Sequence, residues 1–192
     1  MALLTGSNKI KTAVFISGTG SNLKSLIQFS KLKKSPIVIE MIISNNAKSK
    51  GLQYAKVYKI KKKVFDFKNN SSEKKVINEL KNNNINLICL AGFMKILSKN
   101  FIKNFKGKIL NIHPSLLPKY KGLNTHEKAI ENKDKYSGCT VHFVNSKLDS
   151  GKIINQKKVR ISKLDTSRTL AKKILIQEHK LYPAAIMKIF SL

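Results

Sequence analysis

The sequence is poor in cysteine and contains no long apolar run. Its two cysteines, Cys89 and Cys139, occupy strand-like apolar stretches without metal-ligand spacing, which predicts buried thiols in a reducing compartment. No apolar run approaches the roughly 18 residues of a membrane span. The first six residues are too short and too weakly basic for a secretion signal. We therefore expect a cytoplasmic protein with no membrane partner.

Acidic residues are also scarce, with 10 Asp and Glu against 38 Lys and Arg and a formal net charge of +28. Such a charge raises the hypothesis of a basic nucleic-acid-binding protein. However, arginine occurs only at Arg160 and Arg168, and bidentate base recognition favours arginine over lysine. The lysines are scattered and are not interleaved with stacking aromatic residues. We predict no nucleic-acid partner, and a charge that helps to steer anionic metabolites.

The pattern of apolar segments predicts one α/β domain over residues 11–192, after a leader at residues 1–10. No internal repeat, low-complexity tail or linker interrupts it. Strands are expected at 11–17, 36–44, 63–65, 86–91, 109–113, 137–145 and 153–160, and helices at 23–29, 47–58, 71–83, 98–105 and 127–131, with a final helix from 165 that reaches Pro183. The alternation of strands and helices implies a mostly parallel sheet flanked by helices. Ligands then belong at the carboxyl ends of the strands.

The segment Gly18–Leu23 joins the first strand to the first helix. A glycine turn at a helix N-terminus can bind phosphate through backbone N–H groups, and Ser21 and Asn22 add side-chain donors. The glycines could instead form only a tight turn, with Ser21 as a helix cap. The dinucleotide-binding motif requires a third glycine where Leu23 stands, which counts against NAD.

The segment Ile109–Pro118 presents Asn111 and His113 on the same face of a predicted strand. An amide and an imidazole that share one target atom suit an oxyanion developing on a carbonyl. Pro114 and Pro118 restrict the backbone on either side of the turn. The alternative is a polar strand end in which His113 is bonded into a turn.

Few carboxylates are available as a partner for His113. Six are expected on solvent-facing helices, at helix ends or as a helix cap: Glu73, Glu79, Glu127, Glu131, Asp134 and Asp165. Of the rest, Asp149 and Glu178 are the candidates, although Asp149 could serve an ordinary turn and Glu178 could be a surface charge. We expect a structural role for His142.

Five ordered segments resemble the signature of the folate-dependent formyltransferases, and most closely that of the phosphoribosylglycinamide formyltransferase family. They are Ser17–Asn22, Ala91–Met94, Asn111–Pro118, Val141–Val144 with Leu148–Gly151, and Gln177–Pro183. The likeness spans roughly residues 11 to 190. It implies a single-domain, Rossmann-like formyltransferase fold.

The resemblance implies transfer of a formyl group from 10-formyltetrahydrofolate, as co-substrate, to the amine of 5-phosphoribosylglycinamide in de novo purine biosynthesis. It also implies small-molecule substrates, no metal, and a monomer or weak homodimer. It assigns catalysis to Asn111, His113 as an imidazolium, and Asp149, and substrate binding to Gly20, Ser21, Asn22 and Glu178. It assigns the folate pocket to Met94, Lys95, Ile96, Leu97, Asn111, Asn145, Ser146, Lys147, Leu148 and Asp149.

Two related activities are alternatives to this prediction. A methionyl-tRNA formyltransferase would suit the basic composition, but it normally carries a further RNA-binding domain. A formyltetrahydrofolate deformylase normally has a regulatory domain ahead of its first strand, whereas the first strand here begins near Lys11.

Overall fold

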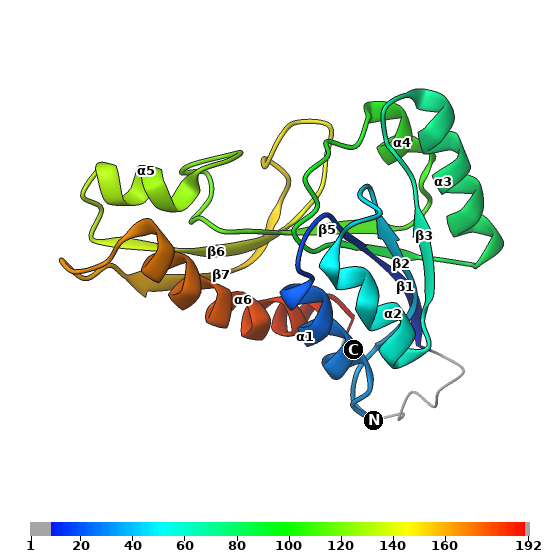
Figure 1. Ribbon diagram of the computed structural model, residues 1–192, viewed down its shortest axis with the longest axis horizontal. Helices are drawn as coiled ribbons and strands as arrows, with labels where there is room; N and C mark the ends of the chain where they lie inside the picture. Colours follow the sequence, from blue (N-terminus) through cyan, green and yellow to red (C-terminus); the bar gives the residue numbers. More distant parts are fainter. Residues whose placement is uncertain (1–8, 191–192) are drawn as a thin grey trace. The chain divides into compact units, whose positions relative to one another are not determined.

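A computed structural model of the chain describes residues 9–190 (Figure 1). The expected leader at residues 1–10 therefore lies almost wholly outside the described residues. The strands form a seven-stranded sheet in the order β3-β2-β1-β4-β5-β6-β7. The pairs β1–β2, β1–β4 and β2–β3 are parallel, and β6–β7 is antiparallel. The expected α/β class with a mostly parallel sheet is confirmed.

The described elements follow the predicted alternation closely. They are β1 (Ile10–Ile16), α1 (Ser21–Ser30), β2 (Ile37–Ser44), the 3-10 helix η2 (Lys50–Leu52), α2 (Gln53–Tyr58), β3 (Lys61–Val64), α3 (Asn70–Asn82), β4 (Leu87–Leu90), α4 (Lys99–Asn104), β5 (Lys108–His113), α5 (Thr125–Glu131), β6 (Tyr136–Phe143), β7 (Ile153–Arg160) and α6 (Ser167–Phe190). No helix among residues 9–190 is long and apolar enough to cross a membrane.

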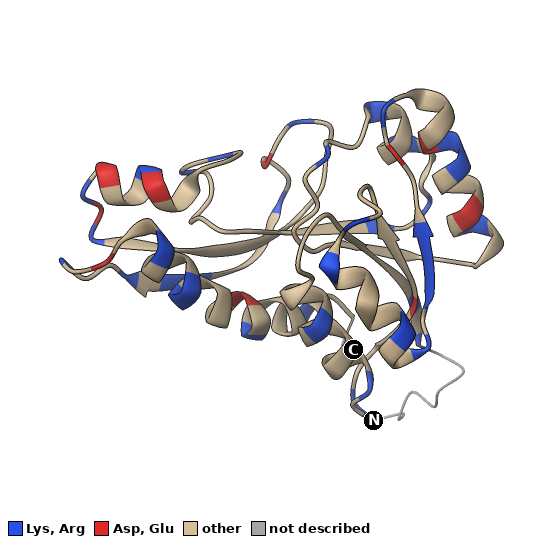
Figure 2. Ribbon diagram, in the orientation of Figure 1, with Lys and Arg blue, Asp and Glu red and all other residues tan. Residues whose placement is uncertain are grey.

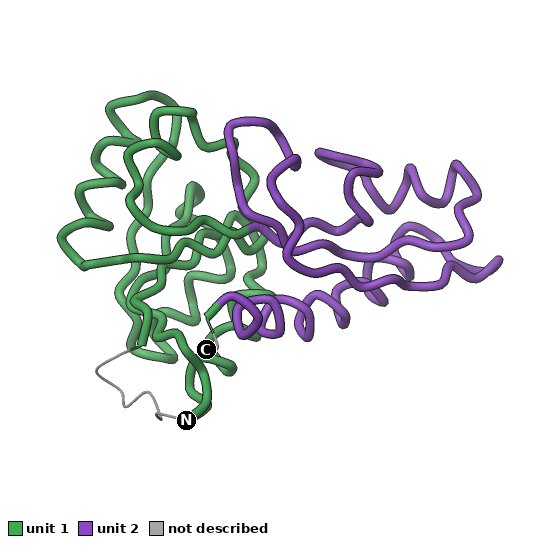
Figure 3. Tube along the Cα trace, turned by 180° about the vertical axis from the view of Figure 1, so that it is seen from behind, with its two compact units in different colours: residues 1–110, 190–192 green, residues 111–189 purple. Residues whose placement is uncertain are grey.

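The chain forms two compact units (Figure 3). Unit 1 comprises residues 1–110 and 190–192, and unit 2 comprises residues 111–189. In unit 1, α1 and α2 lie on one side of the strands and α3 and α4 on the other (Figure 1). The central strand β1 is fully buried from Ala13 to Ile16 because helices cover both of its faces.

Two local predictions in unit 1 were wrong. The helix expected over residues 47–58 begins only with η2 at Lys50, because Asn46 forms a turn in which its side-chain oxygen accepts the N–H of Lys48 over 2.9 Å. The third strand is Lys61–Val64 rather than 63–65. It is the edge strand of the sheet and carries exposed lysines, which a search for apolar runs does not detect.

Glu73 was expected to face solvent, but it is 7% exposed. Its carboxylate accepts the backbone N–H of Ser98 over 2.9 Å and also the Ser98 hydroxyl. Ser98 in turn caps α4 by accepting the N–H of Phe101. Glu73 therefore joins α3 to the start of α4, a contact between residues too distant in sequence to be predicted.

Unit 2 is built on the antiparallel pair β6–β7, with α5 on one face and α6 on the other in both views (Figures 1 and 3). The final helix continues through Pro183 to Phe190, because its buried face extends to Ala185 and Ile186. Cys139 is a buried free thiol, as is Cys89 in unit 1, which confirms the predicted burial of both thiols. Burial, assisted by the charge of Glu178, raises the pKa of Cys139 to about 12, so this thiol is inert at neutral pH.

Candidate functional site

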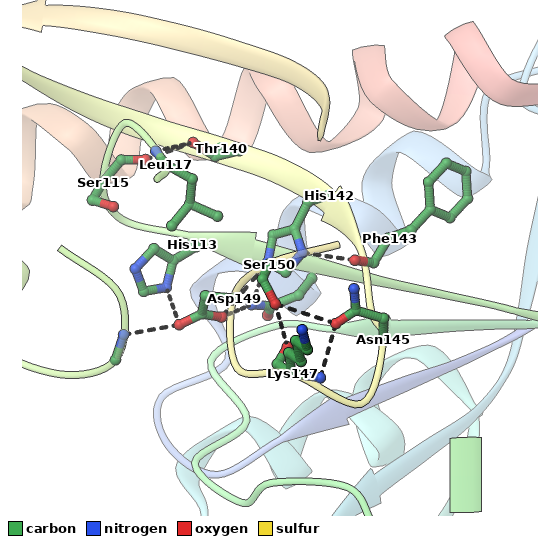
Figure 4. A network of polar contacts seen from close by, with 12 residues as sticks. His113, Ser115, Leu117, Thr140, His142, Phe143, Asn145, Lys147, Asp149 and Ser150 are labelled. Carbon is green, nitrogen blue, oxygen red and sulfur yellow. Dashed lines mark hydrogen bonds and ion pairs between the residues drawn. The ribbon is translucent and has the colours of Figure 1, made fainter. Parts of the chain in front are cut away.

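The predicted amide, imidazole and carboxylate come together within unit 2. The Asn111 Nδ2 atom lies 3.4 Å from Oδ1 of Asp149, and Nδ1 of His113 lies 3.4 Å from Oδ2 of the same carboxylate. Asn111 and His113 lie two positions apart at the end of β5 and so occupy one face of it. Asp149 reaches His113 from the loop after β6 (Figure 4). One carboxylate thus faces both polar side chains of the strand.

The loop after β6 is internally bonded, which fixes the position of Asp149. The side-chain oxygen of Asn145 accepts the N–H of Lys147 over 2.9 Å, and the Ser150 hydroxyl donates to the Lys147 carbonyl over 3.0 Å. Gly151 must remain a glycine, because a Cβ atom there would lie 1.7 Å from the carbonyl oxygen of Phe143. A rigid loop of this kind can hold a carboxylate in one orientation.

His142 belongs to the same cluster, although a structural role was expected for it. Its Nε2 atom lies 3.2 Å from Nδ2 of Asn111 and 3.6 Å from Oδ1 of Asp149. Its Nδ1 atom lies 2.8 Å from the carbonyl of Phe143, which can only accept, so Nδ1 carries a proton. The sequence predicted that His142 lies in a strand. It did not predict that this strand lies beside β5, because local sequence patterns do not show which strands are neighbours in a sheet.

Both ring nitrogens of His113 have partners. Its Nε2–H donates to the carbonyl of Tyr120 over 2.8 Å, and the side chain is 6% exposed. Burial lowers the pKa of His113 below its ordinary value, although the Tyr120 carbonyl and the charge of Asp149 oppose this effect. Burial therefore favours the neutral ring over the expected imidazolium; in the neutral form the proton is on Nε2, because the Tyr120 carbonyl can only accept, and Nδ1 has a lone pair.

The Asp149 carboxylate remains ionised. Burial alone would raise its pKa, but its contacts with His142, the Gly122 N–H and His113 outweigh burial and lower the pKa below the ordinary range. The Gly122 N–H donates to Oδ2 over 2.9 Å. A carboxylate fixed in this way can stabilise a proton that arrives on the neighbouring imidazole.

The turn after His113 is fastened to β6. The Thr140 hydroxyl donates to the Ser115 carbonyl over 2.6 Å and accepts the N–H of Leu117 over 3.1 Å (Figure 4). Gln156 of β7 donates to the Leu117 carbonyl over 2.9 Å. These bonds give β5 a rigid exit, as the prolines of the segment predicted.

In unit 1 the glycine turn leads directly into the first turn of α1. Gly20 is the N-cap of α1 with φ 76°, so Ser21 is the first helical residue and not the cap. A Cβ atom on Gly20 would lie 2.7 Å from the Cα of Gly51. Gly51 N–H and the Ser49 hydroxyl both donate to the Gly18 carbonyl, over 3.0 and 2.7 Å. The sequence did not indicate that Ser49 and Gly51 support the turn.

The segment Met94–Leu97 lies beside this turn. The N–H of Met94 donates to the Ser17 hydroxyl over 2.7 Å, and that hydroxyl donates to the side-chain oxygen of Asn45. Met94 and Ile96 are 65% and 75% exposed, Lys95 is also exposed, and Leu97 is buried. Exposed apolar side chains next to a polar turn are typical of a ligand-binding surface.

The remaining predicted residues lie in unit 2. Glu178, on α6, is 7% exposed and is therefore not a surface charge. Asn145, Ser146, Lys147 and Leu148 are exposed on the loop that carries Asp149. Within residues 9–190, no group of three or more His, Cys, Asp or Glu side chains could hold a metal ion.

The sequence matches the model of the family described as formyl transferase over residues 10–186. The phosphoribosylglycinamide formyltransferase of Haemophilus influenzae is 45% identical over 180 residues, which cover 92% of this chain and 85% of that protein. The trifunctional purine biosynthetic protein adenosine-3 of Homo sapiens is 43% identical over 187 residues, 95% of this chain but 18% of that protein. This chain thus spans a fifth or less of the length of the trifunctional relatives that it matches.

The fold agrees with that of solved relatives. The crystal structure of phosphoribosylglycinamide formyltransferase from Brucella melitensis superposes with a TM-score of 0.90 at 39% identity, and the match covers 96% of this chain and 97% of that one. The structure from Bacillus halodurans gives a TM-score of 0.89 at 36% identity, with 94% and 95% covered. The resemblance drawn from the five sequence segments is confirmed, and the chain belongs to the formyl transferase family and, within it, to the phosphoribosylglycinamide formyltransferase family.

Proposed function

We propose that residues 11–192 form a formyltransferase domain that moves the formyl group of 10-formyltetrahydrofolate, as co-substrate, to the amine of 5-phosphoribosylglycinamide. Family membership supports the reaction class. The single observation that carries the proposal is the cluster in which Asp149 faces both Asn111 and His113 at 3.4 Å. That cluster combines a donor for a developing oxyanion with a carboxylate-supported proton acceptor.

Asn111 would stabilise the formyl oxygen as the amine attacks. One of its N–H groups donates to His142 over 3.2 Å, whereas its contact with Asp149, at 3.4 Å, is long for a hydrogen bond. The weaker contact is the one that an oxyanion can replace. A preorganised donor of this kind typically contributes about 10²–10³ in rate.

His113 and Asp149 would handle the proton. As the new N–C bond forms, the attacking amine must lose a proton, and the Nδ1 lone pair of neutral His113 can accept it directly or through one water. The imidazolium that results lies 3.4 Å from the Asp149 carboxylate, which favours it electrostatically. As the formyl–nitrogen bond of the folate breaks, the same proton passes to the departing nitrogen.

Binding would be divided among three surfaces. Gly20, Ser21 and Asn22 would hold the phosphate of the ribonucleotide at the N-terminus of α1. The buried carboxylate of Glu178 would accept hydrogen bonds from the ribose hydroxyls. For the folate, we propose Met94, Lys95, Ile96 and Leu97 in unit 1, and Asn111 and the loop residues Asn145, Ser146, Lys147, Leu148 and Asp149 in unit 2, as contact residues. The exposed apolar side chains of Met94, Ile96 and Leu148 suit an aromatic ligand.

The remaining proposals concern setting and partners. We propose a cytoplasmic enzyme of de novo purine biosynthesis, a monomer or weak homodimer, that acts on small molecules without a metal. Lys and Arg occur on helices and strands of both units, including β3 and α6 (Figure 2). Basic residues spread in this way do not indicate a single nucleic-acid-binding face. Their positive charge would attract an anionic substrate.

The decisive experiment offers the purified protein and 10-formyltetrahydrofolate three acceptors: 5-phosphoribosylglycinamide, methionyl-tRNA and water. Release of tetrahydrofolate and formylation of the acceptor are measured together. Turnover that depends on the ribonucleotide supports the proposal. Formylation of the charged tRNA, or release of free formate without an acceptor, would replace it by one of the related activities.

A further inference from the structure

Tyr120 links the catalytic histidine to a carboxylate outside the catalytic cluster. Its backbone carbonyl accepts the Nε2–H of His113 over 2.8 Å, and its hydroxyl donates to Oδ2 of Asp134 over 2.9 Å. The other oxygen of Asp134 binds the ammonium of Lys119 over 2.6 Å. That ammonium also lies 5.0 Å from the centre of the Tyr120 ring. Three residues thus form one small clamp beside His113.

Asp134 has a fixed position of its own. Its N–H donates to the carbonyl of Ala129 over 3.0 Å, and Ala129 is a fully buried residue of α5. The Asp134 side chain is 13% exposed. The carboxylate is therefore held by the end of a helix rather than by a mobile loop.

Tyr120 needs an external restraint. Its φ of 53° is unfavourable for a residue with a side chain. The Lys119 carbonyl next to it accepts the hydroxyl of Ser115 over 2.6 Å, which fixes one side of the residue. The Asp134 carboxylate fixes the other side through the phenol hydroxyl. Without that bond, the backbone could relax and carry the Tyr120 carbonyl away from His113.

We propose that Asp134 is a positioning residue for His113 and acts through Tyr120, whose carbonyl holds the imidazole proton on Nε2 and leaves the Nδ1 lone pair facing Asp149. The proposal rests on the proposed formyl transfer for its effect on rate. Its effect on the histidine itself does not depend on any substrate.

The test must separate the effect of the clamp on His113 from the effects of the titratable groups that face this histidine. Asp149 and His142 act on its charge from the catalytic cluster, and His126 acts on it from α5. None of the three is changed in the variants below. A shift in the His113 signal can then be assigned to the clamp.

The test compares Tyr120→Phe, which removes only the hydroxyl, with Asp134→Ala and with the conservative Asp134→Asn. The matched control is Asp165→Ala, because Asp165 also binds a lysine, Lys173, over 2.7 Å and fastens a turn, but has no described link to His113. The first readout is nitrogen-15 NMR of the four histidine rings, with the His113 signal assigned through His113→Gln. The second is kcat and KM for both substrates, with thermal melting as the check on folding.

In the parent protein we expect the neutral Nε2–H form of His113. In Tyr120→Phe and Asp134→Ala we expect a mixture of tautomers, kcat lowered about ten- to a hundredfold by misplacement of the ring, and KM unchanged within twofold. The kcat of the double variant Tyr120→Phe/Asp134→Ala should be no lower than that of Asp134→Ala alone, because both substitutions act through one contact. Asp134→Asn, which can still accept the phenol hydroxyl, should keep the parent spectrum, as should Asp165→Ala.

An unchanged His113 spectrum in folded Tyr120→Phe and Asp134→Ala would overturn the proposal. An equal loss of kcat in Asp165→Ala would also overturn it, because the effect would then be general destabilisation. If the parent transfers no formyl group but the His113 tautomer still responds to these variants, the clamp stands and the proposed function fails.

Discussion

The Nδ1 atom of His113 lies 3.4 Å from Oδ2 of Asp149, although one residue ends β5 and the other lies in the loop beyond β6. In the neutral form of His113 the proton is on Nε2, directed at the Tyr120 carbonyl, so the lone pair is on the nitrogen nearest the carboxylate. This arrangement is unfavourable at rest and becomes favourable once the ring takes up a proton. The Asp149 carboxylate therefore stabilises the protonated ring that forms during proton transfer more than it stabilises the resting neutral ring.

Asn111→Asp should abolish most of the turnover. The change removes the amide donor and places a second carboxylate about where Nδ2 now lies 3.4 Å from Asp149. Loss of the donor alone should cost about 10²–10³ in kcat, and like-charge repulsion should add to it. The assay is formyl transfer at saturating substrates, with circular dichroism to verify folding. Activity within a few fold of the parent would exclude Asn111 from the reaction.

Gly20→Ala should destabilise the protein by about 1–3 kcal/mol, through its left-handed backbone and a Cβ atom 2.7 Å from Gly51. Gly18→Ala is the matched control in the same turn, because a Cβ atom there meets nothing within 4 Å. Urea unfolding gives both values. KM for the ribonucleotide should rise in Gly20→Ala. Equal free energies of unfolding in the two variants would contradict the close packing of Gly20 on Gly51.

Glu73→Ala should lower the free energy of unfolding by about 1–3 kcal/mol, because the partly buried N–H of Ser98 loses its acceptor. Glu131→Ala, at the exposed end of α5, should change it by less than about 0.5 kcal/mol. Both values come from chemical denaturation at neutral pH. A Glu73→Ala variant as stable as Glu131→Ala would show that the bond between α3 and α4 contributes nothing net.

Stability should fall as the pH falls below neutrality. Burial lowers the folded-state pKa values of His113, His126 and His179, so the unfolded chain binds more protons between those values and the ordinary pKa of 6.5. The free energy of unfolding therefore rises with pH across that window and is reduced below it. The lowered pKa of Asp149 adds stability above 3.8 that is lost as the pH falls through its folded value.

Denaturation between pH 7.5 and 5 measures this dependence. His126→Gln should flatten the curve, because it removes one of the three histidines that must charge. A parallel curve in His126→Gln would show that the histidine titrates alike in the folded and unfolded chains.

Sequence patterns predicted the alternation of elements, the glycine turn, and the pairing of Asn111 with His113 on one face of a strand. These features depend on local periodicity and on turn residues, which neighbouring residues determine. Asp149 was chosen among the ten carboxylates because it lies in Leu148–Gly151, one of the segments that resemble the formyltransferase signature. Its distance from His113 could come only from the fold.

The features that were missed depend on burial or on backbone atoms. The pKa of His113 falls because the side chain is buried, and residue types alone do not give that burial. Tyr120 and Gly122 contact His113 and Asp149 through main-chain groups, which any residue carries. Asp134 has no local signal, because its partners precede it by a whole helix and turn.

The most direct measurement is the turnover of Asp149→Asn and His113→Ala beside the parent, with 10-formyltetrahydrofolate and 5-phosphoribosylglycinamide at saturation. We predict that the parent formylates the ribonucleotide and that kcat falls at least about a hundredfold in each variant, with both proteins folded. Turnover within a few fold of the parent in both variants would show that the carboxylate and the imidazole do not carry the reaction.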